Sequence, residues 1–162
     1  MGSMGTEDAM TAQHRDQLIA ELEAAVNETL AWFEGPGRAS QARIERWGVW
    51  EVLAHLPYWH EATAWGIASA AHGGPPWLIS GTPDEINEAA LRTRAGESIE
   101  AIVAQLRQAT ARLLRVAREA PDLEATVFRF PDGRTLSAGQ RLEMIARHWR
   151  SHIQQLSERA TA

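Results

Sequence analysis

The chain has 162 residues, a length that suits a single domain with one hydrophobic core. Its formal charge of −5, with arginines interspersed among acidic residues, argues against a nucleic-acid-binding protein, which usually presents a basic face. The absence of cysteine excludes disulfides, a cysteine nucleophile and thiolate metal ligands, and it fits a cytoplasmic protein.

The two ends of the chain suggest where the folded part lies. We expect residues 11–159 to form one domain and residues 1–10 to be a cloning scar followed by a flexible N-terminus, because the chain opens Met-Gly-Ser-Met-Gly. Charge, proline or histidine interrupts every long apolar stretch, so no membrane-spanning segment is predicted. The N-terminus also lacks the basic-then-apolar layout of a secretory signal. These features together predict a cytoplasmic protein.

Apolar periodicity predicts the first two helices. Residues 11–34 carry apolar side chains at spacings of three and four, and Gly35-Pro36-Gly37 ends this helix. A second helix is predicted from about residue 47 to residue 72, where Gly73-Gly74-Pro75-Pro76 follows. Pro57 lies inside the second helix, and its missing N–H is expected to kink it.

A capping box opens the next helical region. Thr82 is followed by Pro83 at the first helical position and by Glu85, whose side chain can reach back to the helix start. Helical composition then continues to Ala120, with a bend expected at Gly96.

The last part of the chain predicts an extended piece and a final helix. Residues 128–133 are expected to be extended and to end in a tight turn. Ser137 with Gln140 forms a second capping box, which predicts the start of the last helix. Four long helices joined by loops predict an all-α fold, namely a four-helix bundle.

Three histidines are placed where they could share one metal ion. His148 and His152 are four residues apart on the predicted last helix, so their side chains project about 40° apart, one turn above the other. The pair alone is weak evidence, because a solvated or capping pair gives the same pattern. Both lie at the flank of the apolar stripe, and His55 occupies a comparable flank of the second helix. Three such nitrogen ligands would leave positions open for water or substrate.

The other candidates have simpler interpretations. His60 projects about 140° away from His55, so it is expected to be a surface or core histidine rather than a shared ligand. His72 lies at a helix end, where capping is the expected role. Trp59 and Trp149 are expected to lie in the core or in a pocket wall.

Several segments, in order, resemble one known family. Residues 47–56, Trp-Gly-Val-Trp-Glu-Val-Leu-Ala-His-Leu, resemble the W-S-V-x-x-V-L-x-H-L opening of helix two in the DinB/YfiT-like superfamily. Residues 148–153 resemble the H-x-x-x-H of its last helix, and residues 83–87 are similar to an acidic-hydrophobic-Asn turn of one branch. The turn at residues 131–133 also fits, so the likeness covers about residues 11–158.

The resemblance implies a fold, a metal site and a set of relatives. It implies an up-down-down-up four-helix bundle and a divalent metal site, for zinc, nickel or a similar ion, formed by His55, His148 and His152. Asn87 carries over as a pocket residue, beside the Trp59 and Trp149 already considered. The implied relatives are mycothiol-dependent maleylpyruvate isomerase-type proteins, bacillithiol-dependent transferases, and colibactin-resistance proteins of the ClbS/DfsB type.

Three functions stay open at this point. A metal-dependent transferase or isomerase would use a low-molecular-weight thiol, such as mycothiol or bacillithiol, on a small electrophilic substrate, and the sulfur would come from that cofactor because the chain has no cysteine. A metal-dependent hydrolase would activate water instead and would need a general base, for which the sequence offers no obvious carboxylate. Glu51 is better spaced than Glu143, but a surface role is its simpler interpretation. A metal-independent self-resistance or sequestering protein of ClbS type would bind a reactive small molecule.

The expected partner is the same in all three cases. We expect a small-molecule substrate or ligand and neither a nucleic acid nor a membrane as partner, since the chain is acidic and lacks a predicted spanning segment. The sequence leaves a homodimer through the bundle helices open.

Overall fold

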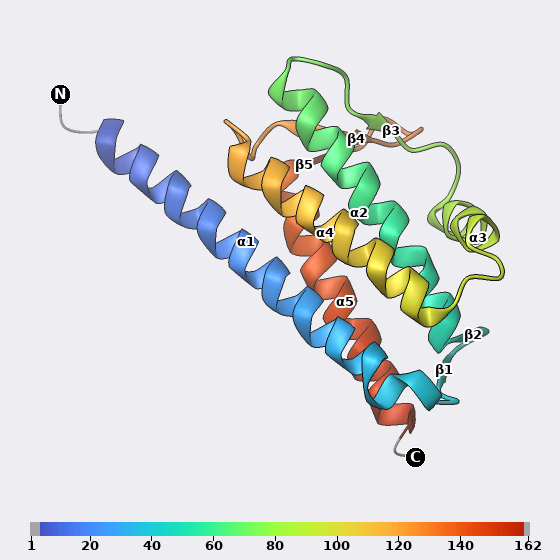
Figure 1. Ribbon diagram of the computed structural model, residues 1–162. Helices are drawn as coiled ribbons and strands as arrows, with labels where there is room; N and C mark the ends of the chain where they lie inside the picture. Colours follow the sequence, from blue (N-terminus) through green and yellow to red (C-terminus); the bar gives the residue numbers. More distant parts are fainter. Residues whose placement is uncertain (1–3, 161–162) are drawn as a thin grey trace.

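The computed structural model describes residues 4–160, with side chains described from residue 11 onward. Five α-helices dominate this part of the chain (Figure 1). They are α1 (Met4–Glu34), α2 (Val49–Ala71), α3 (Pro83–Thr93), α4 (Ile99–Glu119) and α5 (Ala138–Ala160), and a short 3-10 helix, η1 (Pro36–Ala39), follows α1.

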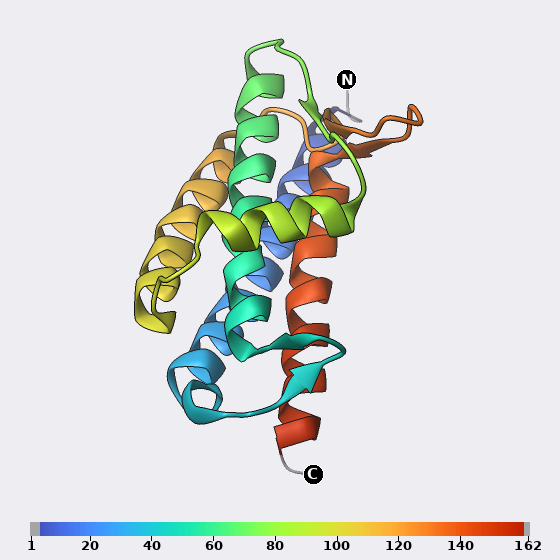
Figure 2. The same cartoon turned by 90° about the vertical axis from the view of Figure 1, so that its right-hand side faces the viewer.

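The four long helices form a bundle in which two helices run in one direction and two run in the opposite direction. Figures 1 and 2 show α1 and α5 running one way and α2 and α4 running the other, which is the up-down-down-up arrangement. The main packing partners are α2 with α4 and α1 with α5. Each helix contributes fully buried leucine or isoleucine to one core; examples are Leu22, Leu53, Leu106 and Leu142. The predicted all-α four-helix bundle is therefore confirmed.

The region between Pro83 and Ala120 differs from the prediction. A single helical run with a bend was expected, but α3 is a separate helix that crosses α2 at a steep angle (Figure 2). Gly96 has a φ of 86°, a conformation that glycine adopts readily, and it lies in the turn that separates α3 from α4. Ser98 then caps α4 by accepting a hydrogen bond from the backbone N of Ala101 at 3.1 Å. A glycine turn followed by a serine cap thus ends one helix and starts another.

The first helix begins earlier than expected. α1 starts at Met4 rather than near residue 11, and residues 6–10 contain neither glycine nor proline to interrupt it. The first three residues of the expected cloning scar lie outside the described part of the chain.

Both predicted capping boxes are confirmed. At the start of α3, the hydroxyl of Thr82 accepts from the backbone N of Glu85 at 3.2 Å, and the Glu85 carboxylate accepts from the backbone N of Thr82 at 3.1 Å. At the start of α5, the hydroxyl of Ser137 accepts from the backbone N of Gln140 at 3.2 Å, and the Gln140 side-chain oxygen accepts in return at 2.9 Å. The second box fixes where the helix that carries His148 begins.

Short strands occupy three of the connections between the helices. β1 (Arg43–Ile44) pairs antiparallel with β2 (Trp47–Gly48), while β4 (Thr126–Arg129) pairs parallel with β3 (Trp77–Leu78) and antiparallel with β5 (Thr135–Ser137). The extended piece expected at residues 128–133 corresponds to the end of β4 and the turn that follows it.

A glycine on α2 allows β4 to pack closely against the bundle. A Cβ atom at Gly66 would lie 2.6 Å from the carbonyl oxygen of Val127, so only glycine permits this approach. The approach brings Phe128 next to Trp59 of α2, with ring centroids 6.2 Å apart. The small sheet therefore closes one side of the space beside α2 and α5.

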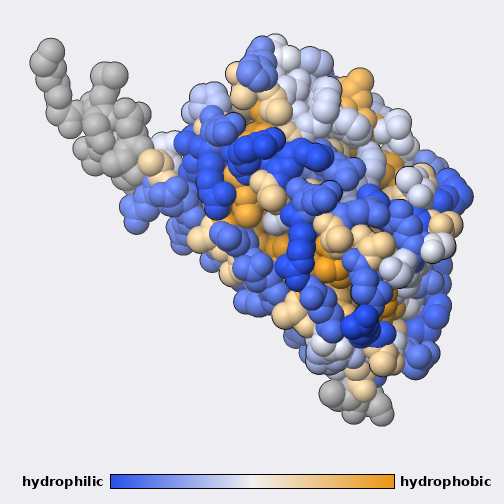
Figure 3. Space-filling model, viewed as in Figure 1, coloured by the Kyte–Doolittle hydropathy of each residue, from blue (hydrophilic) through white to orange (hydrophobic). Residues whose placement is uncertain are grey.

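The surface is mostly polar on the face shown in Figure 3, where an apolar strip follows the line between α1 and α4. Within residues 4–160, no helix combines the length and the apolar character needed to cross a membrane.

Candidate metal centre

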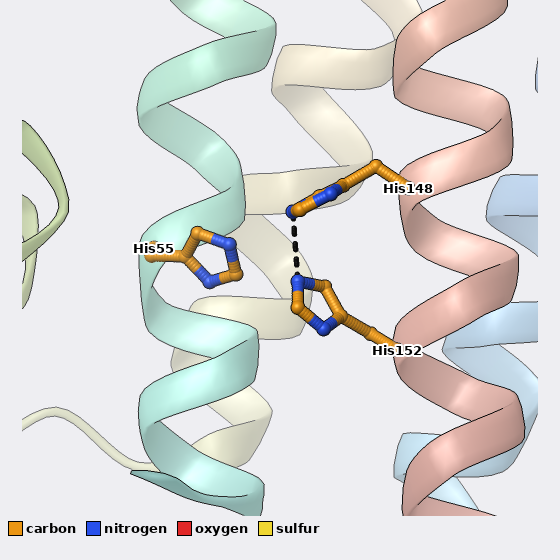
Figure 4. Close-up of side chains that lie close together, drawn as sticks. All are labelled: His55, His148 and His152. Carbon is orange, nitrogen blue, oxygen red and sulfur yellow. Dashed lines mark hydrogen bonds between the residues drawn. The ribbon is translucent and has the colours of Figure 1, made fainter. Parts of the chain in front are cut away.

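Three histidines meet between α2 and α5. His55 of α2 faces His148 and His152 of α5 (Figure 4), and one potential ligand atom from each lies within 4.8 Å of the other two. The ring of His55 has its centroid 5.8 Å from that of His148 and 5.2 Å from that of His152. The structure thus brings together the three residues that helical spacing singled out.

The orientation of His55 is held by its own helix. Its Nδ1 lies 2.5 Å from the carbonyl oxygen of Val52, so this nitrogen carries the proton and donates to the backbone. The lone pair of Nε2 then faces the other two histidines, as in protein metal sites where a backbone carbonyl fixes the ligand tautomer. Trp47 packs on the same ring at 4.8 Å between centroids, and His55 is only 1% exposed.

The two histidines of α5 contact each other directly. Nε2 of His148 and Nε2 of His152 lie 2.7 Å apart, so one ring donates a hydrogen bond to the other (Figure 4). Two nitrogen ligands with bonds of about 2.1 Å to one ion lie roughly 3.0–3.4 Å apart. The two Nε2 atoms would therefore have to move apart by only about 0.5 Å to bind the same ion. Nδ1 of His152 is buried without a hydrogen-bond partner among the described residues. The donor set fits a divalent transition metal, which imidazole ligands favour.

All three rings are kept neutral. Burial, with smaller contributions from His152 and His148, lowers the pKa of His55 to about 3. Burial, followed by the effect of His148, lowers the pKa of His152 to about 4. Partial loss of hydration lowers the pKa of His148, and the nearby Arg141 guanidinium acts in the same direction. Neutral imidazole is the form that binds metal ions, so the environment favours ligation at pH 7.

A pocket of about 480 Å³ adjoins the cluster and includes His148 in its wall. The predicted pocket residues Trp59, Asn87 and Trp149 all line it, and Nε1 of Trp59 donates to the side-chain oxygen of Asn87 at 2.7 Å, which ties α2 to α3. The complete lining consists of Leu56, Trp59, Pro83, Asn87, Phe128, Phe130, Leu136, Arg141, Met144, Ile145, Arg147, His148, Trp149 and Ser151.

Among the residues described with side chains, no acidic one lines this pocket. Glu51 is engaged at the start of α2, where its carboxylate accepts from the backbone N of Gly48 at 3.1 Å. Glu143 lines a different groove, formed by residues of α1 and α5. Neither of the two carboxylates that were considered as a general base therefore lines the pocket.

Sequence reasoning missed Arg141, a charged residue in the pocket wall. Arg141 is 7% exposed, and its guanidinium lies 4.5 Å from the ring centroid of Phe128 and 5.5 Å from that of Trp59. Burial lowers the pKa of Arg141 to about 10, so the side chain is still charged at neutral pH. The available signal was its position seven residues before His148, which places both on one side of the same helix.

Comparisons with known proteins agree with this architecture. The model of the DinB superfamily matches residues 10–156. No curated protein matches the chain in sequence. A crystal structure of the mycothiol-dependent maleylpyruvate isomerase is similar, with a TM-score of 0.70 and 21% identity over 90% of this chain and 60% of that one. A histidine-to-alanine variant of that enzyme gives a TM-score of 0.70 and 20% identity over the same shares, 90% and 60%.

The likeness extends over nearly all of this chain and shows a shared fold, and the chain spans 60% of the length of the isomerase.

Proposed function

The chain belongs to the DinB superfamily, and we propose that it is a metal-dependent transferase or isomerase that uses a low-molecular-weight thiol on a small electrophilic substrate. The observation that carries the proposal is the three-histidine cluster beside a pocket in a chain without cysteine. Three protein ligands leave coordination positions open, as catalytic rather than structural sites do. The similar fold of an enzyme described as mycothiol-dependent supports the thiol as the exogenous ligand.

The residues of the chain have distinct roles in this proposal. His55, His148 and His152 would hold the ion, with zinc or nickel suiting an all-imidazole set. A divalent ion held there would lower the pKa of a bound thiol so that it reacts as a thiolate. The hydrogen bond from His55 to Val52 keeps one ligand in a fixed orientation before any ion binds.

The pocket would position the electrophile. The wall of the pocket is mostly apolar and aromatic. Such a wall favours an organic substrate, which would displace water from the pocket when it binds. The hydrogen bond between Trp59 and Asn87 holds the α2 and α3 sides of this wall together.

Hydrolysis by metal-activated water is less well supported, because that mechanism needs a general base near the open coordination positions. Within residues 11–160 no carboxylate lines the pocket, and the Glu51 carboxylate already caps α2.

Metal analysis tests the site itself. We expect about one zinc or nickel ion per wild-type chain after loading and dialysis, and only background metal in the His148→Ala, His152→Ala double variant. His60→Leu is the matched control, since it removes a buried histidine of α2 that lies outside the cluster, and it should keep its ion. Equal metal content in the double variant and the wild type would overturn the assignment.

Thiol use is tested separately by calorimetry. Metal-loaded protein titrated with mycothiol, and in a second series with bacillithiol, should bind one of the two, and an analogue with hydroxyl in place of thiol should bind at least tenfold more weakly. Absence of binding at millimolar thiol would contradict the proposed chemistry. Binding of a reactive small molecule by metal-free protein would instead favour a sequestering role.

A further inference from the structure

Arg141 carries a buried positive charge without a negative partner. The residue is 7% exposed, and none of its guanidinium nitrogens lies within 4.0 Å of a carboxylate oxygen among residues 11–160. Buried arginines are rare unless they are paired, because removing a charge from water is costly. The missing partner is therefore a feature that requires an explanation.

The contacts of the guanidinium leave part of it available. Nε and Nη2 of Arg141 both lie 3.3 Å from the hydroxyl oxygen of Thr63, which is a long distance for a charged donor. The hydroxyl hydrogen of Thr63 is directed to the carbonyl oxygen of Trp59 at 2.7 Å, so the hydroxyl oxygen can only accept from Arg141. Nη1 has no hydrogen bond to any residue in the part of the chain described with side chains. Arginine has five N–H donors, and several of these remain for a ligand.

Those donors belong to a side chain that lines the same pocket as His148. The two residues are seven apart on α5, so they point to nearly the same side and are separated by about 10 Å along the helix axis. Most of the wall between and around them is apolar, including Leu56, Phe128 and Ile145. The pocket wall thus holds the buried Arg141 cation and His148 of the histidine cluster about 10 Å apart along α5, with mostly apolar residues around them, while its second arginine, Arg147, is exposed.

We propose that Arg141 binds the carboxylate of a small organic acid whose apolar body occupies this pocket and whose reactive end reaches the histidine cluster. A planar guanidinium matches a carboxylate through two parallel hydrogen bonds, and one buried cation balances one carboxylate. The inference deepens the proposed function and rests on it only for the reaction at the histidine end.

Carboxylate binding is tested with hexanoate and its neutral analogue hexanamide. Calorimetric titration is done with chelator-treated protein, so that no carboxylate can bind to a metal ion. Wild type should bind hexanoate at least tenfold more tightly than hexanamide, and Arg141→Met should lose this preference, because charge-assisted hydrogen bonds are worth at least that factor. Arg150→Met is the matched control, since Arg150 lies on the same helix outside this pocket, where it pairs with Glu21 and Glu28, and it should keep the preference.

Folding of the variant provides a second readout. Replacement of a buried unpaired charge by a residue of similar length is often neutral or stabilising, so Arg141→Met should melt at the same temperature as the wild type or higher. Arg141→Lys keeps the charge without the planar pair of donors, and it should bind hexanoate several-fold more weakly than wild type while still preferring it over the amide.

Several outcomes would overturn the proposal. These are an unchanged preference for hexanoate in Arg141→Met, an equal loss in Arg150→Met, tighter binding of inorganic phosphate than of hexanoate, or no wild-type binding of hexanoate at tens of millimolar. The His148→Ala, His152→Ala double variant should keep the preference for the acid. A failure of the metal and thiol experiments would therefore leave the carboxylate result intact, and the two proposals can be separated.

Discussion

His55 and His60 lie five residues apart on α2 and are almost equally buried, with exposures of 1% and 0%. Burial is the main reason that the pKa of each is lowered to about 3. His55 nevertheless faces two further imidazoles, whereas His60 contacts Trp149 and the hydroxyl of Thr110. Burial and a perturbed pKa are thus shared by both residues, and only the convergence of donor nitrogens distinguishes the candidate ligand from the core histidine.

The largest expected difference between the two histidines is the effect of metal on stability. An ion that binds only the folded chain, at 100 times its Kd, raises the free energy of unfolding by about 2.7 kcal/mol. We expect zinc or nickel to give this stabilisation in wild type and in His60→Leu, and to give none in His55→Leu. Denaturant unfolding with the metal and with EDTA measures it. The distinction fails if His55→Leu is stabilised as much as the wild type.

Acid sensitivity should instead be the same for both residues. Each has an ordinary pKa of 6.5 and a pKa of about 3 in the folded protein, so below pH 6.5 the unfolded chain binds a proton that the folded chain does not. Stability is therefore lost as the pH falls from about 6.5 towards 3, by about 2 kcal/mol per residue between pH 7 and pH 5.

Urea unfolding in EDTA at pH 7 and pH 5 tests this. His55→Leu and His60→Leu should each reduce the loss of stability by about 2 kcal/mol. If His60→Leu loses as much unfolding free energy between pH 7 and pH 5 as the wild type, His60 is not a buried neutral group in the folded protein.

The smallest expected effect concerns the hydrogen bond that His60 makes. The hydroxyl of Thr110 lies 3.2 Å from Nδ1 of His60, and no other described residue forms a hydrogen bond with that ring. Thr110→Val keeps the shape of the side chain but removes this partner, so it should cost about 1–2 kcal/mol of unfolding free energy. The stabilisation by zinc should not change, because His60 lies outside the cluster. A smaller stabilisation by zinc in this variant would show that His60 contributes to metal binding, contrary to the distinction drawn between His55 and His60.

Local patterns made much of the bundle and the cluster predictable from the sequence. Capping boxes at Thr82 and Ser137 depend on residues three apart, so they can be recognised without knowledge of the tertiary structure. His148 and His152 lie on one helix, and their spacing of four residues alone predicts that their side chains are neighbours. The approach of His55 to these two residues depends on how α2 packs on α5, which residue spacing does not predict. The resemblance to a family is what indicated that the three histidines lie together.

Features that depend on contacts between distant segments were not predictable in the same way. β3 exists because Trp77 pairs with Phe128, fifty-one residues later, and no local pattern indicates this. The separation of α3 from α4 did have a local signal, since Gly96 is followed by the capping residue Ser98. Arg141 was missed because one arginine in an apolar stripe looks like a surface residue until its neighbours are known.

The placement of Arg141 and His148 on one helix has a consequence for how the pocket can vary. The spacing between these two side chains is set by seven residues of α5, whereas the spacing to His55 is set by the packing of two helices. Substitutions at the α2–α5 contact can therefore change how closely the histidines approach without altering the length of the pocket. One residue inserted between Arg141 and His148 would instead rotate one against the other by about 100°, so that the two could no longer face the same ligand. The spacing along α5 therefore sets the length of the ligand that can reach both Arg141 and His148. The packing of α2 on α5 sets how far His55 lies from His148 and His152.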